Sequence, residues 1–599
     1  MPSTSENRGG SIAYVLLLTL VAALGGLLFG YDTAVIAGAI GYLQVRFELT
    51  PFWEGFAAAC ALAGCALGAG SAGFLSDRFG RKKVLVLAAV AFFISALGTS
   101  LPRTLTEFLV FRFVGGMGIG AASIISPMYI AEIAPFRIRG RMVSLNQFAI
   151  ILGMLIVYFV NYFVIEYGLA SDEKIVAARI AEHGSALDKS FVKTYLDKRV
   201  PELVDQQVEQ FLVEPRNALD RWAVADFLAS QGLTLDAKNV AGDDRALSPA
   251  FVRDFLGERL PAANRRRIDQ FLTSPKPLDS KAVAGFLFTE AKIRIEPIEV
   301  DLAAYDLKSW NVERGWRWMF GSGVAPALVF LVLLLAVPES PRWLTKNGRR
   351  DEALAILTRV DGPQFARDEL CGIEEALTVE SGRLSELGEP WMRRVLVLGI
   401  ALAVLQQVTG INVILYFAPK IFTIAGAEAS MAMLQTVIVG AVNMVFTILA
   451  VLVVDRLGRR PLMLLGTVGM GIALTGLGLA FYWQLFQWWA LVFVLGYIAC
   501  FAMSVGPVTW VILSEIFPTQ IRGRAMGIAT VCLWLANYVV SLTYPIMVKN
   551  PWLLARFHQG FPFWVYAAFC VVLVVVVLRW VPETKGKSLE EIERSWLKT

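Results

Sequence analysis

Two ionisable side chains interrupt apolar stretches that are long enough to cross a bilayer. Asp32 ends the segment Gly25-Gly-Leu-Leu-Phe-Gly-Tyr-Asp32, and Arg112 lies early in the apolar stretch 107–131. An unpaired charge inside a membrane costs roughly 3 kcal/mol or more, so such residues are functional candidates by default. If the two stretches pack in one bundle, the side chains can pair, and a motion that separates them would capture or release a proton. The alternative is a static structural ion pair.

A run of polar side chains lies inside another apolar stretch, 394–424. Its amides are Gln406, Gln407 and Asn412. Three aromatic residues are candidates for the same pocket: Tyr416, Trp510 and Trp534. Amides donate to and accept from hydroxyl groups together, and aromatic faces pack on the C–H surface of a sugar ring. The pattern therefore predicts a site for a polyhydroxylated ring, and the alternative is that the amides join helices to one another.

Charged motifs occur twice along the chain. Asp77-Arg-Phe-Gly-Arg81 recurs 378 residues later as Asp455-Arg-Leu-Gly-Arg459, and the segment 131–141 recurs 383 residues later as 514–524. This repeat predicts two six-helix halves of the same topology, which is a transporter architecture with its site between the halves. We expect the repeated charges to form salt-bridge clusters that latch the halves in one state. The gating candidates are Asp77, Arg81, Glu132, Arg139, Asp455, Arg459, Glu515 and Arg522.

The elements that must position these residues are membrane spans. The chain is 56% hydrophobic and only 18% charged, with a mean hydropathy of +0.58, which excludes an ordinary soluble domain. Twelve apolar stretches have spanning length. They are 12–40, 53–75, 84–101, 107–131, 141–164, 316–337, 394–424, 431–454, 461–483, 489–513, 523–547 and 561–581. We therefore predict an all-α membrane protein of twelve transmembrane helices in two pseudo-repeats.

The arrangement of basic residues predicts the orientation. Arg- and Lys-rich connections such as 77–83 and 455–460 alternate with poorly charged ones, which places the basic side and both termini in the cytoplasm. The absence of any Asn-x-Ser/Thr sequon fits a bacterial inner membrane. A net charge of +5 is too small to suggest nucleic acid as a partner, and the six cysteines have no metal-site or disulfide spacing. We predict neither an enzyme nor a bound cofactor, and a lipid bilayer as the surroundings.

One segment is foreign to this composition. The Pro-Glu motifs at Pro338 and Pro582 are only 244 residues apart, so the first half carries 139 extra residues. Residues 171–310 contain 20 basic and 23 acidic residues and an internal repeat of 60 residues, which predicts a water-facing helical insertion outside the cytoplasm. The predicted boundaries are 1–165 for spans one to five, 166–312 for the insertion, 313–340 for span six, 341–392 for cytoplasmic linker helices and 393–599 for the second half.

Taken together, the motifs resemble the sugar porter branch of the major facilitator superfamily, and most closely its bacterial proton-coupled pentose transporters. The matching segments are Gly30–Asp32, Asp77–Lys83, Glu132 with Arg137–Arg141, Pro338–Arg342, Gln406–Asn412, Asp455–Arg460, Gly506–Trp510 and Pro582–Gly586. They extend over the whole chain except about 166–312. The resemblance implies proton coupling through Asp32 and Arg112. It also implies sugar contacts from Gln147, Gln406, Gln407, Asn412 and Trp510, a pocket lined by Phe29, Tyr416 and Trp534, and a further contact from Asn443.

The resemblance thus predicts a secondary active importer of a monosaccharide, coupled to protons and working by alternating access. Leu533 stands where the pentose-transporting members have a glutamine, so one sugar hydrogen bond is missing and either a pentose or a hexose fits. One alternative is a uniporter of the same fold, against which the carboxylate of Asp32 argues. The other is a sugar sensor or a scaffold whose insertion binds a protein partner.

Overall fold

The computed structural model describes residues 11–135, 138–183, 307–379, 389–485, 488–517 and 521–585, with 252–253, 272, 283–284, 298 and 301–302. Every element bounded within them is helical. The chain divides into two compact units. The membrane unit contains Met1–Val164, Trp316–Ala427 and Met431–Thr599, and the inserted unit contains Ile165–Gly315 with Glu428–Ser430. The predicted 60-residue repeat falls almost wholly outside the described residues.

The first half of the membrane unit is built from the helices that precede Pro338. They are α1 (Ile12–Ala34), α2 (Ile36–Arg46), α3 (Pro51–Phe79), α4 (Arg81–Ser100), α5 (Leu105–Ile133), α6 (Arg139–His183), α14 (Trp316–Gly321) and α15 (Val324–Ala336). α1 and α2 form one span with a break at Val35, and α6 continues without a break past the end predicted for span five at Val164.

Three helices that lie outside the apolar spans connect the halves: α16 (Pro341–Lys346), α17 (Arg350–Asp361) and α18 (Pro363–Val379). They pack around a small apolar core that includes Trp343, Leu357 and Leu370. The second half follows as α19 (Pro390–Val408), α20 (Ile411–Ile424), α21 (Ala429–Leu457), α22 (Arg459–Tyr482), α23 (Trp488–Met503), α24 (Val505–Ile516), α25 (Arg522–Lys549), α26 (Pro551–Phe557) and α27 (Phe561–Trp580).

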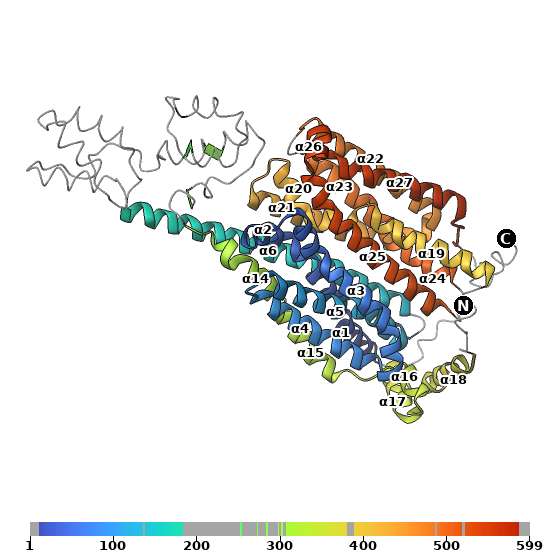
Figure 1. The fold of residues 1–599 in the computed structure, drawn as a ribbon. Coiled ribbons are helices and arrows are strands. Elements are labelled where there is room, and N and C mark those ends of the chain that lie inside the picture. The colour runs from blue at the N-terminus through green and yellow to red at the C-terminus, as the bar shows by residue number, and fades with distance from the viewer. Residues whose placement is uncertain are drawn as a thin grey trace, which may run out of the picture. The chain divides into compact units, whose positions relative to one another are not determined.

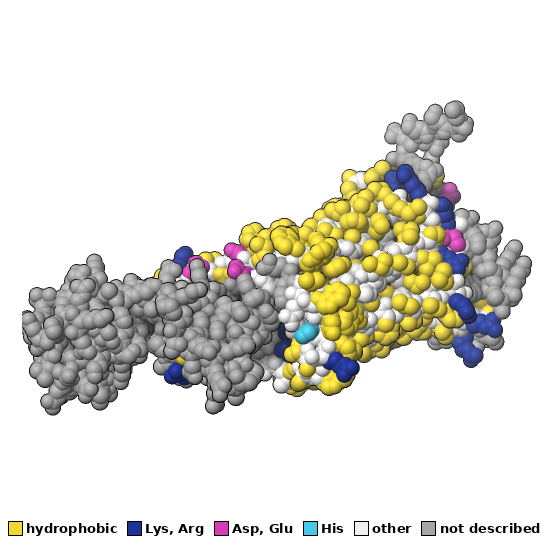
Figure 2. Space-filling model, turned by 90° about the horizontal axis from the view of Figure 1, so that it is seen from above, with side chains coloured by type: hydrophobic (Ala, Val, Ile, Leu, Met, Phe, Trp, Pro, Cys, Tyr) yellow, Lys and Arg dark blue, Asp and Glu magenta, His cyan; other side chains and the backbone are white. Residues whose placement is uncertain are grey.

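Twelve stretches of the described chain are long and apolar enough to cross a membrane, which confirms the predicted number. The last one begins at Pro551 rather than at 561, because α26 and a short turn of 3-10 helix precede α27. Hydrophobic side chains cover most of the face of the membrane unit in Figure 2, while Lys and Arg gather at one end of it. This distribution is that of a protein whose solvent is largely hydrocarbon.

The membrane unit has two distinct ends (Figure 1). The basic end carries α16–α18. The turn at Gly80 lies beside Trp343 of α16, and Gly80 and Gly458 have positive φ angles of 101° and 92°, which favour glycine. The opposite end carries α2, α26 and the C-terminal end of α20. Since each half crosses the membrane six times, both halves contribute helix ends to each of these surfaces.

The described part of the inserted unit is closed at its base by hydrogen bonds. Asp172, on the extension of α6, accepts from the Ser309 hydroxyl at 2.7 Å and from the Trp310 backbone N–H at 2.7 Å. The Asn311 amide donates to the Ile165 carbonyl at 3.2 Å. The chain thus leaves this unit next to the place where it entered, which allows an insertion between two spans of one half.

Candidate functional site

The structure brings the two predicted intramembrane charges together. Nη1 of Arg112 on α5 lies 3.1 Å from Oδ2 of Asp32 on α1 and 3.0 Å from its backbone carbonyl oxygen. The Arg112 side chain is 1% exposed and that of Asp32 is 15% exposed. The guanidinium also lies over the ring of Phe320, 5.5 Å from its centroid. The pairing therefore follows from the packing of α1 on α5.

Asp32 also borders a small cavity within the first half. Its volume is about 10 Å³, which is enough for roughly one water molecule. The other lining residues are Leu28, Tyr31, Val35, Phe92, Ala96, Phe320 and Gly323. A carboxylate paired on one side and facing a water-sized space on the other can take up a proton without leaving its helix.

The amides of the second half form a continuous chain. Nε2 of Gln406 donates to the carbonyl oxygens of Val505 and Gly506 on α24 at 3.2 and 3.0 Å. The side-chain Oε1 of Gln406 accepts from Nε2 of Gln407 at 3.4 Å, and Oε1 of Gln407 accepts from Nδ2 of Asn412 at 2.5 Å. Gln406 thus joins two helices, which was the alternative role considered for the amides, whereas Asn412 at the far end of the chain is only partly buried.

A helix break explains how these amides come to face one another. Gly410 separates α19 from α20 with a left-handed φ of 91°, and a methyl group there would lie 2.6 Å from the Tyr566 ring. The break frees backbone groups that side chains then satisfy, since the Tyr497 hydroxyl donates to the Thr409 carbonyl at 3.0 Å. Interrupted helices of this kind are tolerated at membrane depth only where protein or a water-filled cavity surrounds them.

The aromatic candidates connect the amides to the first half. The rings of Phe29 on α1 and Trp534 on α25 meet edge to face, with centroids 5.6 Å apart. Asn412 and Tyr416 share one face of α20, because they are four residues apart. Tyr416 in turn lies beside Asn537, which lies three residues after Trp534. Side chains of both halves therefore surround one region.

The other predicted sugar contacts are Trp510, Gln147 and Asn443. Trp510 lies one turn after Gly506 on α24 and is partly buried. Gln147 is exposed on α6, and Asn443 is buried on α21 at 7% exposure. Within the described residues neither of these two side chains hydrogen-bonds with Gln406, Gln407 or Asn412. The structure brings the amide chain and the aromatic residues together, and the sugar contacts of Gln147 and Asn443 stay predictions.

At the basic end the Arg81–Glu132 pair of the first half is almost buried, while Asp77 beside it is exposed. Arg81 contacts both carboxylate oxygens of Glu132, with the shortest distance 3.0 Å, and Asp77 at 3.2 Å. The Ser340 hydroxyl donates to the same Glu132 carboxylate. Arg139, another of the gating candidates, lies 3.3 Å from Glu369 on α18. The cluster therefore joins spans of one half to the connecting helices.

The corresponding cluster of the second half contains the pair Arg459 and Glu515, 3.2 Å apart. The side chains of the predicted members Asp455 and Arg522 lie outside the described residues. In both clusters the described ion pairs join residues of the same half or of α16–α18. The expected latch between the halves stays a prediction at this end.

Two carboxylates that the sequence reasoning noted only as repeat markers complete these clusters. Glu339 accepts from the backbone N–H groups of Arg81 and Lys82 at 2.9 and 3.1 Å, at the start of α4. Glu583 accepts from those of Arg459 and Arg460 at 3.1 and 3.0 Å, at the start of α22. Their equivalent places in the Pro-Glu motifs are the signal that could have identified them as helix caps.

Two further groups were missed because they look ordinary in sequence. Asn537 is 1% exposed, and its Nδ2 has no hydrogen-bond partner in the described structure, so it offers a donor beside Tyr416. Glu54 on α3 is fully buried against Lys420 and Lys549 of the other half. Its position at the start of an apolar stretch was the only sequence signal.

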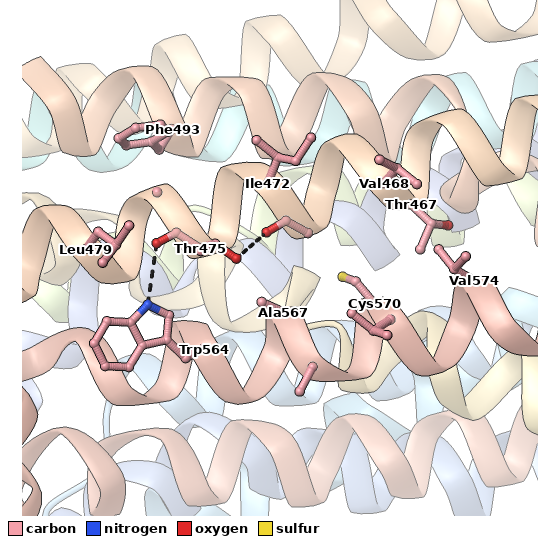
Figure 3. A pocket seen from close by; sticks show the side chains of 14 residues that line it. Thr467, Val468, Ile472, Thr475, Leu479, Phe493, Trp564, Ala567, Cys570 and Val574 are labelled. Carbon is pink, nitrogen blue, oxygen red and sulfur yellow. Dashed lines mark hydrogen bonds between the residues drawn. The ribbon is translucent and has the colours of Figure 1, made fainter.

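A groove with a different lining lies elsewhere in the described residues. It has a volume of about 800 Å³ and runs between α22, α23 and α27, where Thr475 accepts a hydrogen bond from Trp564 at 3.4 Å (Figure 3). The rest of its lining is mostly apolar, including Ile472, Phe493 and Cys570. None of the predicted site residues lines it. It therefore has the character of a lipid-facing surface and not of a sugar site.

Comparison with known proteins agrees with this geometry. A profile described as "Sugar (and other) transporter" matches residues 18–175 and 301–596. The chain is 37% identical to the D-xylose-proton symporter of Escherichia coli K12, over 98% of this chain and 96% of that protein, and 34% identical to the arabinose-proton symporter of Bacillus subtilis, over 100% and 98%. The solved inward-open structure of the E. coli xylose transporter matches with a TM-score of 0.65 and 35% identity, over 97% of this chain and 100% of that one. The chain belongs to the sugar (and other) transporter family.

Proposed function

We propose that this protein is a secondary active transporter that imports a monosaccharide together with a proton by alternating access. The observation that carries the proposal is the buried ion pair of Asp32 and Arg112, because Asp32 follows Phe29 by one helical turn and Phe29 contacts Trp534 of the other half. A proton-binding group and a sugar-binding surface thus share one helix. The names of the two relatives, a xylose and an arabinose symporter, support the same reading.

Proton coupling depends on whether Asp32 is ionised and paired with Arg112 or carries a proton. The ionised carboxylate neutralises the buried guanidinium, whereas a protonated carboxyl leaves that charge uncompensated in a medium of low dielectric constant. Each protonation state therefore favours a different placement of α5 relative to α1. Because α1 also carries Phe29, the change reaches the sugar pocket.

The sugar binds between the halves at the free end of the amide chain. Asn412 and Gln407 present donors and acceptors, Asn537 adds an unpartnered donor, and the Phe29–Trp534 pair supplies an apolar face. The buried Leu533 adds no hydrogen bond. Such a pocket accepts a pentose or a hexose.

The basic end is the cytoplasmic end, by the positive-inside rule. Sugar therefore enters from the opposite end and leaves between the two charge clusters. The insertion, residues 166–312, is then a water-facing module on the non-cytoplasmic side, where it is available to a protein partner. Deletion of 171–310 tests this role: intact uptake by the shortened protein supports an interaction module, and lost uptake in a still-folded protein contradicts it.

Uptake into proteoliposomes tests the transport proposal. We expect labelled xylose, arabinose or glucose to accumulate only when a proton gradient, acidic outside, is imposed. The Asp32→Asn variant should lose accumulation but keep exchange of sugar for sugar, while Glu48→Gln, an exposed carboxylate at the opposite end, should behave like the parent. Uptake that ignores the gradient would identify a uniporter, and accumulation by Asp32→Asn would refute the role of that carboxylate.

A second experiment separates ligand from structural amides. Asn412→Ala should weaken sugar binding about tenfold or more with little change in thermal stability, because one good hydrogen bond is worth about 1 kcal/mol and its loss also leaves a sugar hydroxyl unpaired. Gln406→Leu should lower the melting temperature more, because the carbonyl contacts on α24 are lost. Equal effects of both changes on stability and binding would contradict this division.

A further inference from the structure

A charged cluster lies at the opposite end of the membrane unit. Glu54, in the first turn of α3, has a side chain that is 0% exposed. Its Oε2 lies 2.8 Å from Nζ of Lys549 at the end of α25, and its Oε1 contacts Nζ of Lys420 on α20. Lys420 also donates to the amide oxygen of Gln44 on α2 at 3.1 Å. We call these four residues the Glu54 cluster.

The members of the Glu54 cluster come from different halves. Glu54 and Gln44 belong to the first half, and both lysines belong to the second. The carboxylate is thus shared by two ammonium groups that sit on two separate helices of the other half. A contact of this kind cannot stabilise either half by itself, so it acts only on their association.

The same surface continues inward as a tight seam between α3 and α25. A methyl group on Gly55 would lie 2.3 Å from the carbonyl oxygen of Leu542, so the two backbones are nearly in contact. Next to it, at the following residue of α3 and one turn earlier on α25, the rings of Phe56 and Tyr538 meet at right angles, 6.5 Å apart. Positions 549, 542, 538 and 534 follow a spacing of seven, four and four, which places them on one face of α25. That face reaches from the cluster to the sugar pocket at Trp534.

The charges of the Glu54 cluster favour halves that are either fully together or fully apart at this end over a partly separated state. With Glu54 between them, the two lysines neighbour an opposite charge, and without it they repel one another. Removing one partner from a buried cluster leaves an uncompensated charge, which is strongly unfavourable. If the halves separate completely, however, all the charged groups return to water, and their hydration offsets the lost contacts. The cluster therefore stabilises the fully closed state and makes a partly open state unfavourable.

We propose that the Glu54 cluster is the lock that holds the non-cytoplasmic entrance shut during the transport cycle, which rests on the proposed alternating-access function. Sugar from outside cannot reach the amide chain until Glu54 leaves Lys420 and Lys549. The carboxylate is a positioning residue, since it sets the balance of the two states and does not touch the sugar. Its loss raises the fraction of molecules open at this end.

Distance measurements between spin labels test the lock without sugar or protons. Labels are placed at Phe52 on α3 and Trp552 on α26, which are both exposed, in a full-length Cys371→Ser background reconstituted in nanodiscs. Glu54→Gln should raise the ratio of long to short distances about tenfold or more, and Lys549→Gln about threefold because Lys420 stays in place. Glu48→Gln at the same end is the matched control and should leave the ratio unchanged.

Charge exchange supplies the decisive outcome. Glu54→Lys alone should open the entrance further, and Glu54→Lys with Lys420→Glu should restore the parent ratio, because a carboxylate again lies between two ammonium groups. A folded Glu54→Gln protein that stays closed, or a folded double variant that stays open, would overturn the lock. If these distances change as expected while no sugar uptake is found, the lock stands and the proposed function fails.

Discussion

The two ends of the membrane unit use the same kinds of charge for different tasks. At the basic end, Arg81 binds Glu132 and Arg459 binds Glu515, and each described pair lies within one half. At the opposite end, Glu54 of the first half is bound by lysines of the second. Ion pairs inside a half stabilise a rigid body, whereas ion pairs between halves set the balance between conformations.

The degree of burial follows the same division. The side chain of Glu54 is 0% exposed, those of Arg81 and Glu132 are 8% and 10% exposed, and those of Arg459 and Glu515 are 15% and 22% exposed. The free energy lost on breaking an ion pair grows as water is excluded. The structure is therefore a state that is closed at the opposite end, and its basic-end clusters differ in strength from one half to the other.

The largest effect on stability is expected from Arg81→Gln. This change leaves the nearly buried Glu132 carboxylate without its cation, so the free energy of unfolding should fall by about 3 kcal/mol. Arg459→Gln should cost roughly half as much, because Glu515 is more exposed. Thermal unfolding in detergent measures both.

The exposed Arg78→Gln on the same stretch of chain is the control for these variants, and it should melt like the parent. None of the three changes should alter the distance between labels at the opposite end. Equal costs for Arg81→Gln and Arg459→Gln would contradict the difference between the clusters. An opened entrance in either variant would contradict the division of tasks between the ends.

Gly55→Ala should act on the opposite end with the next largest effect. The added methyl group meets a backbone oxygen that cannot move aside, so α3 and α25 can no longer close on one another. The ratio of open to closed molecules should rise about tenfold, measured with the same label pair, and uptake should slow. Gly73→Ala on the same helix meets no atom within 4 Å and should change neither. If both variants open the entrance, the cause is helix propensity and not the seam.

Much of this organisation could be predicted from the sequence. Hydropathy and the repeated charge motifs predicted twelve spans in two halves, because each span must bury its backbone and cover itself with apolar side chains. The pairing of Asp32 with Arg112 followed from the cost of an unpaired charge in a membrane. These are properties of single segments and of their solvent.

The Glu54 cluster could not be predicted in this way. Glu54 reads as an acidic residue in the first turn of a helix, and Lys420 and Lys549 read as basic residues near the ends of spans. They are 366 and 495 residues away from Glu54 along the chain. Only the packing of two distant segments buries them together. For the same reason the sequence predicted both Arg81 and Glu132 as gating charges but did not predict that they pair with each other.

Tyr158→Phe should have a smaller effect on the balance between the halves. The Tyr158 hydroxyl on α6 donates to the Leu415 carbonyl on α20 at 2.9 Å, and that carbonyl is available because Pro419, four residues on, has no N–H. Losing the bond costs about 1 kcal/mol, which is roughly a fivefold shift toward the open state. Tyr162→Phe on the same helix is the control. An unchanged distance ratio in Tyr158→Phe would mean that this bond persists in both states.

The smallest effect is expected from Glu583→Gln at the basic end. Burial alone would raise the pKa of Glu583, but the backbone N–H groups of Lys585, Arg459 and Arg460 outweigh it and hold the pKa below its ordinary value. A carboxylate with a lowered pKa stabilises the fold above its ordinary pKa, and this contribution disappears as the pH falls through the lower value. Glu583→Gln should therefore lower the free energy of unfolding at pH 7 by less than about 1 kcal/mol, since the site is partly exposed.

The pH dependence separates a charge effect from a packing effect at this helix start. The difference in melting temperature between the parent and Glu583→Gln should shrink steadily below pH 4.5 and vanish once the carboxyl is protonated. If the difference is the same at every pH, the N–H groups contribute through packing at this site and not through the negative charge of the carboxylate. Because Glu583 caps α22 of its own half, the entrance should stay closed throughout, so an opened entrance here would show that the basic end also controls the association of the halves.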